Sequence, residues 1–115
     1  MDKDSDQIYV EHIVQAIAAL QAFTRGVRFE QFAQDLKTQS AVARQLEIIG
    51  EASKRLSAEF KSELGALPWK KIAGMRDFLI HDYLAIDLRE VWQAATVDIK
   101  EVKAALESRR KMYKF

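Results

Sequence analysis

The chain has 115 residues, of which 49% are hydrophobic and 30% charged, and its formal net charge at pH 7 is +1. This composition is typical of a globular protein and unlike that of a disordered one, and the length suffices for one domain with a core of its own, which we place at residues 1–115. The near-zero net charge gives no overall attraction to nucleic acid. No apolar run is long enough to cross a bilayer, and no signal-peptide core follows the acidic start, so we expect a cytoplasmic protein without a membrane partner.

The absence of cysteine excludes disulfides and thiolate metal sites, and it fits a reducing compartment. The two histidines, His12 and His81, lie far apart in the sequence, so we expect neither a metal site nor a cofactor. We interpret His12 as a surface residue of a helix. Residues 1–11 carry a net charge of −3 and residues 100–115 one of +4. The basic end could contact phosphates, although cations that complement a helix C-terminus are the simpler interpretation.

Apolar residues at spacings of three and four predict a first helix over residues 5–24, which Gly26 ends. A short helical passage is predicted over residues 28–35. The next helix is expected to be capped by Thr38 or Ser40, and its apolar seam comprises Val42, Leu46, Ile49, Ser53 and Leu56.

Gly50 lies in the middle of that helix, where glycine is unfavourable, so we expect another helix to approach it closely. Glu51 and Arg55 stand four residues apart and could pair on a solvated face. Residues 57–67 read as a loop or a broken helical turn. Asp87 caps a last helix from about 88 to 110. The predicted fold is therefore all-α: an up-down bundle of four main helices plus a short additional helix.

A central helix begins near Pro68, which suits a first-turn position. From Trp69 to Leu84 its apolar residues cover nearly the whole circumference, which predicts burial on more than one side. A bundle this thin cannot cover such a helix on every side, so we expect a symmetric homodimer that buries the spare face. The alternative is a helix enclosed within a single chain.

The same helix carries ionisable groups that are costly in apolar surroundings unless they are paired or functional. Arg76 offers a fork of donors that suits phosphate, and His81 is the best candidate for proton transfer. Asp77 lies four residues before His81 and could orient its imidazole. Arg76 and His81 diverge by about 140° on a regular helix, so two helices meeting at a dimer axis would present them best to one ligand. Tyr83 returns to the face of Arg76.

An arginine and a histidine without metal ligands suggest phosphoryl chemistry that needs no metal. On RNA a 2′-hydroxyl can act as the nucleophile, and His81 would then move protons while Arg76 would offset charge. The alternative is structural: His81 is a core histidine satisfied by Asp77, and Arg76 belongs to a buried ion pair.

The segment Arg76-x4-His81-x-Tyr83 resembles the R-x4-H-x-Y motif of HEPN-domain ribonuclease toxins. The resemblance to the HepT-like branch extends over about residues 8–106. It includes the sequences IIGEA at 48–52, LPW at 67–69, IAGMR at 72–76 and IDLREVW at 86–92.

This resemblance implies a HEPN-like helical homodimer and a metal-independent endoribonuclease that leaves a 2′,3′-cyclic phosphate. Arg76 and His81 would be catalytic, with Asp77 in support. It further implies the toxin of a type II toxin–antitoxin pair, whose cognate nucleotidyltransferase antitoxin transfers AMP to Tyr83. The dimer itself, or a higher oligomer with that antitoxin, is the expected assembly. An alternative is a non-catalytic HEPN module that binds a nucleotide or its nucleotidyltransferase.

Overall fold

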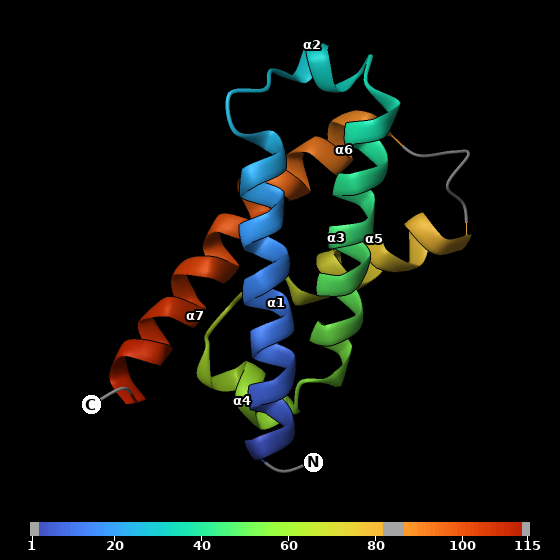
Figure 1. Ribbon diagram of the computed structural model, residues 1–115. Helices are drawn as coiled ribbons and strands as arrows, with labels where there is room; N and C mark the ends of the chain where they lie inside the picture. Colours follow the sequence, from blue (N-terminus) through green and yellow to red (C-terminus); the bar gives the residue numbers. More distant parts are fainter. Residues whose placement is uncertain (1–2, 82–86, 114–115) are drawn as a thin grey trace.

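The computed structural model describes residues 3–81 and 87–113, and it describes the side chains of residues 5–79 and 87–109 (Figure 1). Within these residues every regular element is a helix, which confirms the all-α prediction. The elements are α1 (Lys3–Thr24), α2 (Phe29–Phe32), α3 (Leu36–Arg55), α4 (Ala58–Glu63), α5 (Trp69–His81), α6 (Leu88–Gln93), the π-helical η2 (Ala94–Asp98) and α7 (Ile99–Tyr113).

Helix α3 is the centre of the arrangement, because it packs against both α1 and α5. Helices α1 and α3 run antiparallel, α5 crosses obliquely behind α3, and α7 returns from the α6 end toward the end where α1 begins (Figure 1). The core is formed by the faces that these helices turn toward one another. Its largest fully buried side chains are Ile13, Ile17, Leu20, Phe32, Val42, Ile49, Ser53, Ile99, Val102 and Leu106.

The start of α3 and the segment that follows α3 differ from the sequence-based expectations. Helix α3 begins at Leu36 and its cap is Asp35, which accepts hydrogen bonds from the Thr38 backbone N–H (3.2 Å) and hydroxyl (2.6 Å). Thr38 is therefore a donor to the cap, not the cap. The segment after α3 contains a defined helix, α4, because Ser57 caps it by accepting from the Phe60 N–H.

The last long helix is interrupted by a π-helical turn at Ala94–Asp98. Such a turn adds a residue and rotates the helix beyond it. It lets the neighbouring Ala94 and Ala95 both face the core while Ile99 remains buried. Regular helical spacing does not reveal this turn, because the apolar pattern on either side stays compatible with an uninterrupted helix.

A buried carboxylate joins the start of α1 to the start of α4. Asp6 accepts hydrogen bonds from the backbone N–H and the hydroxyl of Ser57, both at 2.7 Å. These bonds satisfy a charged group that would otherwise be costly to bury.

Two cations of the basic C-terminal segment are engaged within the chain. Lys103 donates to Gln21 (3.1 Å), and Arg109 pairs with Glu63 while its guanidinium lies 4.7 Å from the centre of the Phe60 ring. These two side chains therefore have partners on other elements of the chain, which is neither of the two interpretations made from the sequence. No helix in the described part of the chain is long and apolar enough to cross a membrane.

Candidate functional site

Helix α5 carries the candidate site, and its sequence explains how it is held. It begins just after Pro68, whose carbonyl accepts the Ile72 N–H at 3.0 Å. Ile72 and Leu79 are buried and fix one face of α5 on the rest of the bundle. Helix α5 is also tied to η2, because Lys71 Nζ lies 2.7 Å from Asp98 Oδ2.

Gly50 sets the distance between α3 and α5. A Cβ atom placed on Gly50 would lie 2.2 Å from the Cβ of Arg76 and 3.1 Å from the Ile72 carbonyl oxygen. Real atoms do not approach so closely, so the two helices can meet here only because residue 50 lacks a side chain. The expected close approach at Gly50 is confirmed, and the residue that makes it is Arg76.

The contact with Gly50 directs the Arg76 side chain along α3. Its Nη2 lies 2.8 Å from Oε2 of Glu51, and its Nη1 donates to Oδ1 of Asp77 at 2.9 Å. Only 23% of the side chain is exposed. Its Nε is buried and finds no acceptor among the side chains that the structure describes. The guanidinium is thus fixed in orientation by two carboxylates while part of its edge still reaches solvent.

Each of these carboxylates also holds a second cation from α3. Asp77 Oδ1 accepts from Lys54 Nζ at 2.6 Å, and Glu51 Oε1 accepts from Arg55 Nε at 3.3 Å. The hydrogen bond from Lys54, followed by that from Arg76, lowers the pKa of Asp77. Hydrogen bonds to Glu51 and then to Tyr9 raise the pKa of Arg55.

We call these five side chains the arginine cluster: Glu51, Lys54, Arg55, Arg76 and Asp77. It contains three cations and two carboxylates and so carries one net positive charge. Exposed Lys54 and the accessible edge of Arg76 share Asp77 as a partner. A phosphate placed there would meet two cations that are already held together.

The structure brings together only part of the predicted site. Arg76 and Asp77 are adjacent and joined by a hydrogen bond. His81 is the last residue of α5, but its side chain, like Tyr83 altogether, lies outside the described residues.

Two members of the cluster were missed in the sequence. Glu51 was expected to pair with Arg55, which is confirmed, but its bond to Arg76 was not foreseen. Lys54 was not singled out at all. The available signal was Gly50: Lys54, four positions after this predicted helix contact, lies on the same face of the helix and can reach the partner helix.

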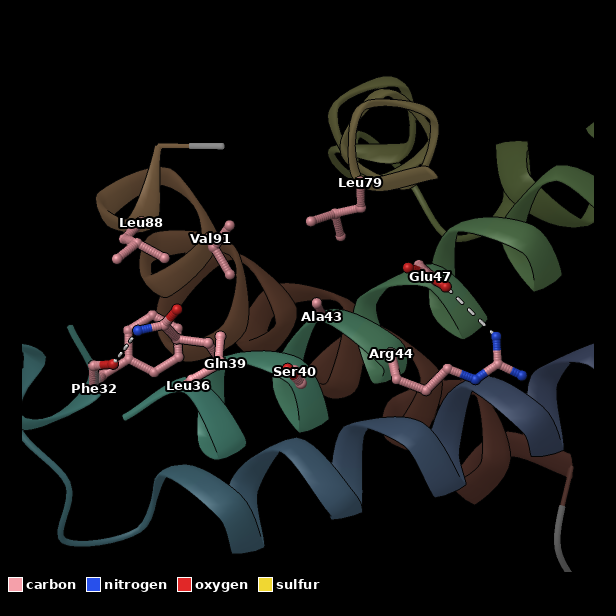
Figure 2. Close-up of a pocket in the computed structure, with 10 residues that line it drawn as sticks. All are labelled: Phe32, Leu36, Gln39, Ser40, Ala43, Arg44, Glu47, Leu79, Leu88 and Val91. Carbon is pink, nitrogen blue, oxygen red and sulfur yellow. Dashed lines mark hydrogen bonds and ion pairs between the residues drawn. The ribbon is translucent and has the colours of Figure 1, made fainter. Parts of the chain in front are cut away.

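A separate groove lies between α3, α5 and α6, and Figure 2 shows its lining. Its volume is about 510 Å³. Leu79, Leu88 and Val91 form its apolar wall, and Leu36 at its edge is 75% exposed. Figure 2 shows Arg44 extending away from that wall to pair with Glu47.

Comparison with known proteins gives a consistent result. The family model described as "Ribonuclease HepT-like" matches residues 13–109. A Thermococcus cleftensis protein named "Probable ribonuclease HepT" is 46% identical over 109 residues, which cover 95% of this chain and 99% of that protein. A Caldanaerobacter subterraneus subsp. tengcongensis protein, provisionally named as an RNase, is 43% identical over 83% of this chain and 85% of its own length.

A Methanocaldococcus jannaschii protein, also provisionally named as an RNase, is 34% identical over 93% of this chain and 88% of its own length. No solved structure matches the chain.

Proposed function

The chain belongs to the HepT-like ribonuclease family, and from this premise we propose that it is a metal-independent endoribonuclease in which Arg76 and His81 form the catalytic pair. The observation that carries the proposal is the arginine cluster. An arginine that contacts the backbone of α3 at Gly50, and that two carboxylates fix in place, is prepared to receive negative charge without reorganising.

In the proposed reaction the 2′-hydroxyl of RNA attacks the adjacent phosphorus. The 2′-O–P bond forms, the P–O5′ bond breaks, and a 2′,3′-cyclic phosphate and a 5′-hydroxyl result. One histidine takes the proton of the 2′-hydroxyl, and a second supplies the proton to the departing 5′-oxygen. Arg76 offsets the charge that develops on the phosphorane, and Asp77 supports it through their 2.9 Å hydrogen bond.

Each chain carries one His81, so a pair of His81 side chains requires two chains, and the surface of α5 supports a dimer. Gly74 is exposed with open space around it, and Phe78 on the same side of α5 is 39% exposed. The alternative of an α5 enclosed within one chain is therefore wrong for these residues. We propose that a second copy covers this face about a two-fold axis and brings two His81 side chains toward one cleft.

We further propose that the protein is the cytoplasmic toxin of a type II toxin–antitoxin pair. A cognate nucleotidyltransferase would transfer AMP from ATP to the hydroxyl of Tyr83, releasing pyrophosphate. Tyr83 lies seven residues after Arg76. A bulky phosphate-bearing group there would repel and obstruct RNA, which is sufficient for inactivation.

One observation favours a second candidate, a non-catalytic module that binds a nucleotide or its nucleotidyltransferase. Arg76 already has two carboxylate partners, Glu51 and Asp77, so it could be wholly structural. This candidate predicts that function survives the loss of His81.

The deciding experiment is cleavage of cellular RNA by the purified, unmodified protein in EDTA, with identification of the product ends. We expect cyclic-phosphate ends, a loss of about 10²–10³-fold for Arg76→Ala and one of about 10²–10⁴-fold for His81→Ala. Arg25→Ala, at an exposed arginine near the end of α1, is the matched control and should cleave normally.

A second arm incubates the protein with its nucleotidyltransferase and ATP. We expect a mass increase of one or more AMP units on Tyr83 and loss of cleavage, whereas Tyr83→Phe should gain no mass. RNA left intact by the unmodified protein would favour the binding module, and unchanged mass would remove the proposed control by AMP.

A further inference from the structure

A second pocket reaches Arg76 from the side of α1, and its other lining residues lie outside the R-x4-H-x-Y motif. Its volume is about 430 Å³, which is within the range of small-ligand sites, about 300–1,000 Å³. Helix α1 contributes Tyr9 and His12, α3 contributes Arg44, Glu47 and Arg55, and α5 contributes Arg76.

The α1 side of this pocket is aromatic. Tyr9 is half-buried and its ring meets that of His12 edge-on, with 6.0 Å between centroids and an interplanar angle of 86°. The guanidinium of Arg55 lies 6.0 Å from the centre of the Tyr9 ring. A planar ring that an imidazole and a guanidinium flank is a surface on which a nucleobase can stack.

The α3 side supplies charge. Arg44 pairs with Glu47 at 3.5 Å, yet 69% of its side chain is exposed, so it can turn outward to a phosphate. The Glu47 side chain is only 25% exposed. Its carboxylate can accept a hydrogen bond from the exocyclic amino group of a base. Three arginines against the carboxylates of Glu47 and Glu51 leave one net positive charge in the pocket.

We propose that this pocket is a second RNA subsite, which binds one unpaired nucleotide next to the phosphate at Arg76. The base stacks on Tyr9 beside His12, and Arg44 and Arg55 contact its phosphate. The inference rests on the proposed function, because Arg76 is where it places the scissile phosphate. It assigns to α1, and to the face of α3 that carries Arg44 and Arg55, a part in holding the substrate strand.

The test measures binding of a single-stranded 2′-O-methyl RNA oligonucleotide, which lacks the attacking 2′-hydroxyl and so resists the proposed cleavage. We expect Tyr9→Leu to weaken binding about tenfold, whereas Tyr9→Phe keeps the ring and should bind within twofold of the unaltered protein. Arg44→Gln should reduce the slope of log affinity against log salt by about 0.7, the value for one phosphate contact on a single strand. Arg25→Gln, at an exposed arginine just after α1, is the charge-matched control and should leave this slope unchanged.

With cleavable RNA, Tyr9→Leu should raise KM while kcat stays within about threefold, whereas His81→Ala should lower kcat. Equal binding by the unaltered protein and by Tyr9→Leu and Arg44→Gln, with cleavage intact, would overturn the subsite and leave the nuclease standing. Binding that depends on Tyr9 and Arg44, without any cleavage, would overturn the nuclease and leave the subsite standing. If Tyr9→Phe bound as weakly as Tyr9→Leu, stacking of a base on the ring would be the wrong account.

Discussion

Arg76 shows how single residues share roles in this protein. Its Cβ touches the backbone of α3 at Gly50, and its guanidinium lies between Glu51 and Asp77. Each of these carboxylates bonds a further cation, so substituting one residue changes the partners of several. A loss of activity in such a cluster identifies a catalytic group only when stability is measured beside it.

The change in thermal stability as the pH falls tests the bonds to Asp77. Its pKa is lowered from the ordinary 3.8, chiefly by the hydrogen bond from Lys54. The ionised carboxylate therefore stabilises the fold above that value, and this contribution is lost as the pH falls through the lowered folded-state pKa. We expect Asp77→Asn to have a lower Tm than the unaltered protein at pH 7, and the gap to close below pH 3.8.

Thermal melts between pH 7 and pH 2 measure that gap. The control repeats Asp77→Asn in a Lys54→Gln background, where the main cause of the lowered pKa is absent and the gap should shrink. A gap of constant size at every pH, in both backgrounds, would show that the bonds to Asp77 do not stabilise the fold through its charge.

At the scale of elements, the crossing of α3 and α5 positions the candidate site. Gly50 permits the contact with Arg76, whereas Gly74, on the exposed side of α5, has no heavy atom within 4 Å of an added Cβ. The two glycines lie in helices yet differ completely in their surroundings. They form a matched pair for separating packing from helix propensity.

We expect Gly50→Ala to lower the free energy of unfolding by about 1–3 kcal/mol, because the added methyl forces the helices apart. It should also reduce cleavage by displacing Arg76. In the dissociated chain, where no second copy covers this face, Gly74→Ala should raise the free energy of unfolding by about 0.5–1 kcal/mol through helix propensity. Urea melts measure both values, and a Gly50→Ala protein as stable and active as the unaltered one would contradict a close crossing of α3 and α5 at this residue.

At the scale of the whole molecule, the proposed chemistry depends on the assembly of two chains. The exposed face of α5 combines Gly74 and Phe78 with the end of the helix that carries His81. A second copy on this face would complete a site that one chain provides only in part.

We expect Phe78→Glu to raise the dissociation constant of the dimer about a hundredfold or more, because burying an unpaired carboxylate in an interface is costly. Phe23→Glu is the matched control: Phe23 lies on α1 and is also 39% exposed. Light scattering over a concentration series reports the mass, and RNA cleavage should fall with dissociation. Dissociation by Phe23→Glu alone would move the interface to α1.

The long helices were predictable because their apolar residues recur with the helical period, and the predicted seam of α3 from Val42 to Leu56 is buried throughout. The start of α3 was not predictable, because Asp35, Thr38 and Ser40 are all good capping residues. Only the path of the chain from α2 decides between them. The π-helical turn at Ala94–Asp98 was missed because apolar periodicity continues across it.

The sequence by itself determined the helical class and the family to which the chain belongs, and it singled out Arg76 as a candidate, since periodicity and motif are properties of local order along the chain. It also indicated, through Gly50, that a helix would approach there. Only the tertiary structure decided that the approaching residue is Arg76, that Glu51 and Lys54 join its cluster, and that Tyr9 and Arg44 line a pocket beside it. These contacts join residues more than 20 positions apart, whose meeting depends on how α1, α3 and α5 pack and cross.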